Sequence, residues 1–167
     1  LEQSISALHA TLEATADGIL VVDKQGKIVS FNQRFVEMWR IPDTIMESLD
    51  DDRVLAFVLD QLVNPRAFET KVRELYGQPE AESFDTLMFQ DGRIFERYSR
   101  SQRIAGQSVG RVWSFRDVSE QRRTEAELRA LFAAMKDVVI VYDADGRYLQ
   151  IAPTDTSILY KPAHEMR

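Results

Sequence analysis

Residues 110–123 are Gly110-Arg-Val-Trp-Ser-Phe-Arg-Asp-Val-Ser-Glu-Gln-Arg-Arg123, the most informative stretch of this chain. Residues 109–116 are predicted to form the last strand, with Trp113 and Phe115 on one face because side chains alternate along a strand. The spacing Asp117-x-x-Glu120 is that of a capping box, in which Asp117 accepts hydrogen bonds from the first N–H groups of a helix and Glu120 reaches back. A shift of the strand would therefore move the helix. Plain capping, worth ~1 kcal/mol, is the simpler interpretation.

Upstream of this stretch, the chain predicts an alternation of strands and short helices. The predicted order is strand 18–23, strand 27–31, a helix from Asn32 to about residue 39, helical segments within 43–81, strand 83–90 and strand 93–104. Gly26 and Asp91-Gly92 favour tight turns between antiparallel strands, and Asn64-Pro65 breaks the helical region. Five strands with helices on one face indicate an α+β layer fold.

This order of elements resembles the PAS domain, the sensory module common in bacterial signalling proteins. Residues 110–123 look like the end of a PAS sheet that runs into the Asp-Val/Ile-Thr/Ser-Glu-Arg-Lys/Arg motif of the exit helix. Asp91-Gly-Arg-Ile-Phe-Glu-Arg-Tyr-Ser99 is similar to a strand of one bacterial PAS subfamily, and Asn32 also fits. The resemblance implies the PAS fold, a five-stranded antiparallel sheet with short helices on one face and linker helices at both ends. Trp39-Arg-Ile-Pro42 departs from the family, since many members place Gly after the first helix, and this departure bears on one wall of the pocket.

The start of the chain recurs 120 positions later. Asp17-Gly-Ile-Leu-Val-Val-Asp23 corresponds to Asp137-Val-Val-Ile-Val-Tyr-Asp143, and Gly26-Lys27 corresponds to Gly146-Arg147 without a gap. Chance similarity is the alternative, but serial arrays of this kind usually sense or relay. The expected domains are a linker helix over 1–16, a PAS domain over 17–117, a connecting helix over 118–134 and the start of a second PAS domain over 135–167.

Composition excludes several kinds of chemistry. The chain has no cysteine, so disulfides, thiolate metal sites and cysteinyl cofactor adducts are excluded. By the resemblance, flavin-photoadduct and cinnamoyl-linked PAS types are excluded too, and no haem is expected because His9 and His164 lie outside the helices beside the pocket. The net charge of −6 argues against nucleic-acid binding, and no apolar run approaches the ~20 residues that span a bilayer. Asp50-Asp-Asp52 is expected to start a helix rather than bind a metal. The domain is expected to lie in the cytoplasm, and the longer protein to which it belongs could be attached to a membrane.

A ligand pocket is expected between the sheet and the short helices. Its candidate residues are Leu20, Val22, Phe35, Leu55, Val58, Phe68, Met88, Tyr98, Trp113 and Phe115. Arg97, Tyr98 and Ser99 are candidate polar groups, and the expected ligand is a small apolar or aromatic molecule. Each candidate is more often packed core than ligand contact, so a core without a ligand is the alternative.

Two further sets of residues are predicted to act in signalling and assembly. The signal-relay candidates are Asp117, Ser119, Glu120 and Arg122. The dimer-seam candidates are Leu1, Ile5, Leu8 and Leu12, a helical stripe that suits either a coiled coil or an ordinary surface helix. The charged side chains within 93–100 and 111–117 are expected to form cross-strand pairs. They form either a solvated sheet edge or a charged surface that docks a partner helix or protomer.

The function predicted from these residues is that of a non-catalytic sensory and relay domain in a tandem PAS array. By resemblance, the output domain would be a histidine kinase or a diguanylate cyclase/phosphodiesterase. The expected partners are a second copy through the flanking helices, the adjacent PAS and output domains, and a small-molecule ligand. A ligand-free dimerisation module is the alternative, and an enzyme is disfavoured because no catalytic constellation can be assembled.

Overall fold

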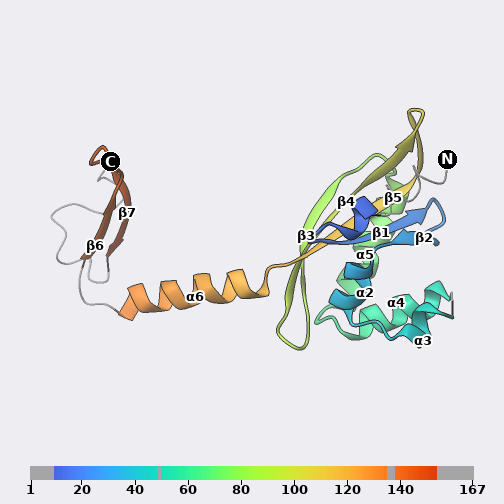
Figure 1. The fold of residues 1–167 in the computed structure, drawn as a ribbon, viewed down its shortest axis with the longest axis horizontal. Coiled ribbons are helices and arrows are strands. Elements are labelled where there is room, and N and C mark those ends of the chain that lie inside the picture. Colours follow the sequence, from blue (N-terminus) through green and yellow to red (C-terminus); the bar gives the residue numbers. More distant parts are fainter. Residues whose placement is uncertain (1–9, 49, 135–137, 154–167) are drawn as a thin grey trace. The chain divides into compact units, whose positions relative to one another are not determined.

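The computed structural model describes residues 10–48, 50–134 and 138–153. The chain divides into two compact units, Leu1–Ser119 and Glu120–Arg167. The first unit holds a five-stranded antiparallel sheet with the strand order β2-β1-β5-β4-β3 (Figure 1). Its strands are β1 (Gly18–Asp23), β2 (Ile28–Phe31), β3 (Ser83–Met88), β4 (Ile94–Ile104) and β5 (Gln107–Asp117). The predicted α+β fold is therefore confirmed.

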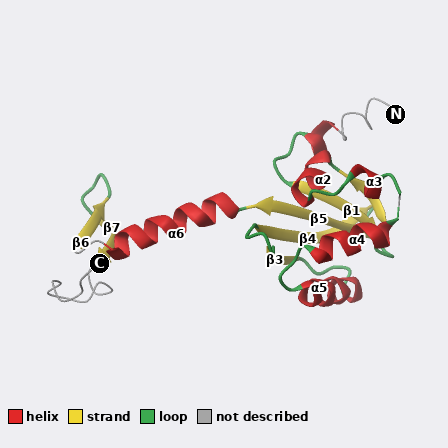
Figure 2. Ribbon diagram, turned by 90° about the horizontal axis from the view of Figure 1, so that it is seen from below, coloured by secondary structure: helices red, strands yellow, loops and turns green. Residues whose placement is uncertain are grey.

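Short helices follow β2 in the sequence and pack on one face of the sheet (Figure 2). They are α2 (Gln33–Trp39), α3 (Asp43–Met46), α4 (Asp51–Asp60) and α5 (Pro65–Gly77). The side chains of Asn32, Asp50 and Asn64 accept hydrogen bonds from the first N–H groups of α2, α4 and α5. Such caps satisfy donors that a helix leaves free at its start. The caps expected at Asn32 and Asp50, and the break at Asn64-Pro65, are thus present.

The pairing of β1 with β5 fixes the middle of the sheet. Leu20 lies opposite Trp113, and Asp23 lies opposite Gly110. A Cβ atom at Gly110 would stand 2.1 Å from the carbonyl oxygen of Val22. Only glycine therefore permits the two backbones to approach this closely.

The core lies between the inner face of the sheet and the helices. Trp39, which is 0% exposed, has its ring centroid 5.0 Å from that of Phe89, 5.7 Å from that of Phe95 and 5.3 Å from that of Phe115. The planes of Phe95 and Phe115 stand at 84° and 89° to the indole, which is a favoured edge-to-face arrangement. This aromatic cluster holds α2 against β4 and β5.

The second unit contains most of α6 (Ser119–Ala134) and a hairpin of β6 (Val138–Tyr142) and β7 (Tyr148–Pro153). Its turn has the same geometry as the β1–β2 turn 120 positions earlier. The N–H groups of Gly26 and Gly146 donate at 3.1 Å to the carbonyls of Asp23 and Asp143, and the two glycines have φ of +84° and +78°. The expected repeat of strand, turn and strand is present, whereas the assignment of residues 135–167 as the start of a second PAS domain stays a prediction.

Three of the four dimer-seam candidates, Leu1, Ile5 and Leu8, lie outside the described residues. Residues 10–13 are helical and include Leu12, whose carbonyl accepts from Asn32 Nδ2 at 2.9 Å. In the parts of the chain that the structure describes, no helix is both long and apolar enough to cross a membrane.

Candidate functional site

A cavity of about 260 Å³ lies between the sheet and the helices of the first unit. Most of the predicted pocket residues line it, namely Leu20, Val22, Phe35, Leu55, Val58, Phe68, Trp113 and Phe115. Trp39 and Tyr76 also line it but were not among the candidates from sequence. Burial raises the pKa of the Tyr76 phenol, so this hydroxyl stays protonated at neutral pH.

Met88 and Tyr98 are not part of this cavity, and their placement as pocket residues is corrected. They lie on the outer face of the sheet, where they are 59% and 37% exposed, whereas Leu87 beside Met88 is 6% exposed. The Tyr98 hydroxyl donates to Glu82 Oε2 at 2.8 Å. Because β3 carries apolar side chains on both faces, alternation alone does not tell which face meets the helices.

The mouth of the cavity is polar, unlike its interior. Lys27, from the β1–β2 turn, lies 3.5 Å from Asp51 at the start of α4 (Nζ to Oδ2), and both residues line the cavity together with Asp52. Asp50 caps α4, accepting from the N–H groups of Asp52 and Arg53 at 3.1 and 3.2 Å. No cluster suited to a metal ion occurs among the residues that the structure describes.

Arg97 is buried behind two rings of the cavity wall, whereas the sequence suggested it both as a polar group of the pocket and as part of a solvated sheet edge. It is 1% exposed and forms a bidentate pair with Asp85, at 2.8 Å from Nε and 2.5 Å from Nη2. Its guanidinium carbon lies 4.5 Å from the ring centroid of Phe68 and 5.2 Å from that of Trp113. Side chains alternate along β4, so Arg97 lies on the inner face with Phe95. Its bidentate bond to Asp85 compensates for removing the charge from water.

Arg111 is the second buried arginine that sequence reasoning placed wrongly at the surface. It is 3% exposed, and burial lowers the pKa of its guanidinium. Its two terminal nitrogens donate to the carbonyls of Leu75, Gln78, Pro79 and Ala81 and to the hydroxyl of Ser99, at 2.9–3.2 Å. Arg111 therefore ties the end of α5, and the residues after it, to the sheet.

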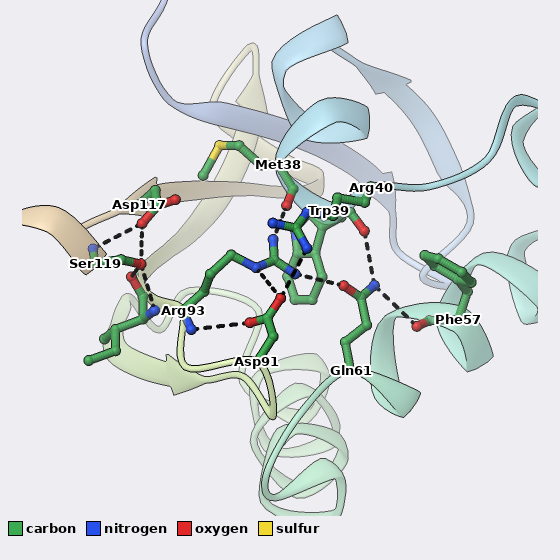
Figure 3. Close-up of polar contacts among 10 residues, drawn as sticks. Met38, Trp39, Arg40, Phe57, Gln61, Asp91, Arg93, Asp117 and Ser119 are labelled. Atoms are coloured by element: carbon green, nitrogen blue, oxygen red, sulfur yellow. Dashed lines mark hydrogen bonds and ion pairs between the residues drawn. The ribbon is translucent and has the colours of Figure 1, made fainter.

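Arg93 is at the centre of a polar network that joins α2, α4 and the β3–β4 hairpin (Figure 3). Its Nη1 donates to the carbonyl of Met38 at 2.5 Å, and its Nη2 donates to Gln61 Oε1 at 3.0 Å. Gln61 Nε2 in turn donates to the carbonyl of Trp39 at 2.9 Å. Asp91 Oδ2 accepts from Arg93 Nε at 2.8 Å. Because α2 and α4 also carry cavity-lining residues, the network connects the cavity wall to the start of β4.

Arg40 lies within Trp39-Arg-Ile-Pro42, the stretch after the first helix where the resemblance implies Gly in many members of the family. It has φ of +52°, in the left-handed region, which costs a residue with a Cβ roughly 1–2 kcal/mol. Its Nη1 lies 3.2 Å from Asp91 Oδ2. Although partial burial opposes it, hydrogen bonds from Arg93 and the charges of Arg93 and Arg40 hold the pKa of Asp91 below its ordinary value. Arg40 thus adopts a backbone conformation that glycine adopts easily, and its side chain adds an ion pair to the network.

Ser119 fastens the start of α6 to the start of β4 (Figure 3). The N–H of Ile94 donates to Ser119 Oγ at 2.9 Å, and the N–H of Val118 donates to the carbonyl of Ile94 at 3.0 Å. Asp117 Oδ1 accepts from the N–H of Ser119 at 2.9 Å and from its Oγ at 2.5 Å. Asp117 thus accepts from an N–H at the start of the helix, as predicted, whereas the described link back to the sheet is made by Ser119 rather than by Glu120.

The other relay candidates, Glu120 and Arg122, lie in the first turns of α6. Arg93 and Ile94 are adjacent in the sequence, so the network around the cavity and the contacts of Ser119 meet at one peptide. Sequence reasoning missed Arg93 and Gln61 because their partners are backbone carbonyls of residues distant in the chain. The site can thus enclose a small molecule and has no described set of residues for catalysis.

Comparisons with known proteins agree on the fold. A family model described as the PAS fold matches residues 12–126, whereas no curated protein matches the sequence. The PAS domain from Bordetella pertussis BvgS is similar, with a TM-score of 0.54 and 13% identity over 80% of this chain and 99% of that one. The sensor region of a sensor histidine kinase has a TM-score of 0.51 and 14% identity, and the match covers 64% of this chain but only 40% of that one. The structure of a phage VqmA–DPO complex has a TM-score of 0.51 and 17% identity over 78% of this chain and 60% of that one. At such identities, the likeness shows the fold alone.

Proposed function

This chain belongs to the PAS family, and we propose that it is a non-catalytic sensory domain that relays the state of its cavity to the start of α6. The observation that carries the proposal is the network around Arg93 (Figure 3). Arg93 and Gln61 hold the last carbonyls of α2, at Met38 and Trp39. The next residue, Ile94, holds Ser119. A path of hydrogen bonds, joined by the peptide bond between Arg93 and Ile94, therefore leads from the cavity wall to the start of α6.

A ligand acts on this chain of contacts through the helices that carry the wall. Phe35 and Trp39 line the cavity from α2, and Val58 lines it from α4. A change in the position of either helix alters the bonds made by Gln61 and Arg93, because both side chains reach between elements. The displacement then reaches Ile94 and the start of α6. A ligand can drive this only by its difference in affinity for two states.

The output domain that follows from this proposal is a histidine kinase or a diguanylate cyclase/phosphodiesterase. A sensor histidine kinase region among the similar structures supports the first of these. The family match ends at residue 126, so it supports one PAS domain in this chain. The repeated turn at Asp143 to Arg147 supports the proposal that residues 135–167 begin a second one.

The relay is tested by filling the cavity and following the backbone at the start of α6. Val58→Phe places a larger side chain in the cavity and so imitates the effect of a bound ligand on the helices around it. We expect it to shift the ¹⁵N–¹H resonances of Ile94 and Ser119 in two-dimensional NMR spectra. Gln61→Leu, combined with Val58→Phe, removes the amide bridge and is expected to reduce these shifts by at least half.

Gln90→Leu is the matched control for this test. Gln90 Nε2 also donates to two backbone carbonyls, those of Asp60 and Leu62 at 3.0 and 3.1 Å. The Gln90 N–H donates to the carbonyl of Gln61, but the Gln90 side chain makes no described bond to Arg93 or to the Gln61 side chain, so its substitution leaves the amide bridge in place. The shifts caused by Val58→Phe should persist in this background. Equal shifts in the Gln61→Leu and Gln90→Leu backgrounds would show that the network does not carry the signal.

The second candidate function, a ligand-free dimerisation module, is favoured by a different observation. Leu128 and Leu131 of α6 are 49% and 63% exposed, and apolar side chains on a charged helix are typical of a partner face. This function predicts a dimer that Leu128→Glu dissociates, whereas Ala126→Glu on the same helix does not. Sedimentation velocity over a range of concentrations measures this, and a monomer at high concentration would exclude it.

A further inference from the structure

The first unit contains a second cavity, which lies beside the one already described. It has a volume of about 710 Å³. The charged residues of its lining are Asp23, Lys24, Glu80 and Arg111, whereas most of the side chains around the first cavity are apolar. Among the described residues, only Tyr76 lines both cavities.

The second cavity continues the first along the inner face of the sheet. On β5, Trp113 lines the first cavity and Arg111 lines the second, and side chains two residues apart point to the same face of a strand. In the β1–β2 turn, residues 25–27 line the first cavity and residues 23–24 line the second. The boundary between the cavities therefore runs from this turn to β5 at the level of Tyr76.

The phenol of Tyr76 lies at this boundary. A Cβ atom at Gly26 would stand 3.0 Å from the phenol oxygen and 3.2 Å from the ring carbon that carries it, so the ring rests against the turn. Burial raises the pKa of the phenol, the charges of Arg111 and Asp23 act on it in opposite directions, and a hydrogen bond with the Trp113 side chain lowers it. The phenol thus interacts with groups of both cavities.

The other parts of the boundary are held in place by hydrogen bonds. Asp23 Oδ1 accepts from the N–H groups of Gln25 and Lys27 at 2.8 and 2.9 Å, which fixes the turn. The guanidinium of Arg111 is fixed by its bonds to backbone carbonyls and to the Ser99 hydroxyl. The ring of Tyr76 is therefore the part of the boundary that a single substitution can remove.

This boundary decides how large a molecule can enter. A dry cavity of about 150 Å³ holds benzene. In proportion, the 260 Å³ of the first cavity holds about ten non-hydrogen atoms. The second cavity is larger than the first, so a passage between them would admit a much longer molecule.

We propose that Tyr76 determines the size of the ligand: its ring separates the two cavities and confines the ligand to the first, which admits a largely apolar molecule of about ten non-hydrogen atoms. This inference rests on the proposed sensory function of the first cavity. It assigns specificity to a residue of α5, a helix that takes no part in the network around Arg93.

The test measures how the affinity of the full chain for 1-alkanols depends on their length. These probes carry an apolar tail for the first cavity and a hydroxyl that can stay in water at its mouth. Tryptophan fluorescence reports binding, because Trp39 and Trp113 both line this cavity. Each methylene that enters should raise the affinity about fourfold. In the unmodified chain the rise should end at about ten non-hydrogen atoms, near 1-nonanol, so 1-decanol and 1-dodecanol should bind within about twofold of each other.

Substitutions then assign this limit to the ring. In Tyr76→Ala the cavities are joined, and 1-dodecanol should bind about tenfold more tightly than 1-decanol. Tyr76→Phe keeps the ring and should keep the limit. Val72→Ala is the matched control, since Val72 lies one turn earlier on α5 and lines only the first of the two cavities. It enlarges that cavity without opening the boundary, so 1-dodecanol should gain no more than about fourfold over 1-decanol.

The possible outcomes separate this inference from the proposed function. The same limit in Tyr76→Ala as in the unmodified chain, or an affinity that rises through 1-dodecanol in the unmodified chain, overturns the role of Tyr76 and leaves the sensory cavity standing. No binding of any alkanol, together with no response to Val58→Phe, overturns both. If Tyr76→Ala fails to fold, Tyr76→Leu decides the matter, because it keeps an apolar side chain but lacks the outer part of the ring, and it too should move the limit to longer alkanols.

Discussion

Asn32→Ala is expected to be among the most destabilising single changes in this domain. Asn32 is 0% exposed, and its Oδ1 accepts from the N–H groups of Ile19 at 2.8 Å and Phe35 at 3.0 Å. Its Nδ2 donates to the carbonyls of Leu12 and Asp17 at 2.9 and 3.0 Å, and to the Thr15 hydroxyl at 3.2 Å. One side chain thus joins β1, the start of α2 and the segment before β1.

The magnitude follows from these five bonds. At roughly 0.5–1.5 kcal/mol each, their sum is about 5 kcal/mol, of which water recovers a part at the half-buried segment around Thr15. The expected loss in the free energy of unfolding is therefore about 3–4 kcal/mol. For a domain of this size, that corresponds to a fall in Tm of roughly 10–20 °C.

Urea unfolding followed by tryptophan fluorescence measures this loss, because Trp39 and Trp113 are both buried. The midpoint should fall while the m-value stays constant. Asn64→Ala is the matched control, since Asn64 caps α5 through a single bond from the N–H of Ala67, at 3.1 Å, on the surface. It should cost about 1 kcal/mol. Equal losses for the two variants would refute the assignment of Asn32 as a buried junction.

Two further predictions concern the sheet and the network. Gly110→Ala should lower the free energy of unfolding by about 3 kcal/mol or more, because the new Cβ would meet the carbonyl oxygen of Val22. Gly77→Ala, whose Cβ would meet no atom within 4 Å outside its own helix and chain neighbours, should instead raise it by roughly 0.5–1 kcal/mol. Thermal unfolding tests both variants, and a tolerated Gly110→Ala would contradict the close approach of β1 and β5. Partial burial opposes ionisation of Asp91, but its bonds to Arg93 hold the pKa of this carboxyl below its ordinary value. The ionised carboxylate therefore stabilises the folded state at pH values above the unfolded carboxyl pKa of about 3.9, and this stability is lost as pH falls through the folded pKa. Asp91→Asn should therefore flatten the fall in unfolding free energy below about pH 4, and an unchanged acid limb in urea titrations would contradict this.

Sequence predicted the parts of the fold that depend on neighbouring residues. Asn32 and Asp50 were recognisable at helix starts because a cap needs only one side chain and the next three residues, and Asn64-Pro65 was recognisable as a break between helices. The Asp-x-x-Gly turn at Gly26 was recognisable for the same reason, and its second occurrence at Gly146 has the same backbone shape. These signals were enough to order the strands and helices, and hence to recognise the family.

The parts that sequence did not predict depend on contacts between distant segments. The inner face of β3 carries Leu87 and the outer face carries Met88, and an apolar residue on each face leaves the choice open. Arg111 was assigned to solvent by its charge, and Arg97 was considered both for the pocket and for a solvated sheet edge. Their burial depends on Asp85 and on the carbonyls at the end of α5, which only the folded chain brings near.

The positions that break local rules favour sensing over a purely structural role. Arg40 adopts a left-handed backbone, Trp39 Nε1 and Arg97 Nη1 lack partners, and Arg111 is buried against uncharged oxygens. Such features cost stability and persist mainly where function requires them. Two of these residues, Trp39 and Arg97, lie on or directly behind the cavity wall, and Arg40 lies in the network that leads to α6. A spacer that only holds two helices apart has no need of such costs, so their position beside the cavity and in the network supports the proposed sensory role.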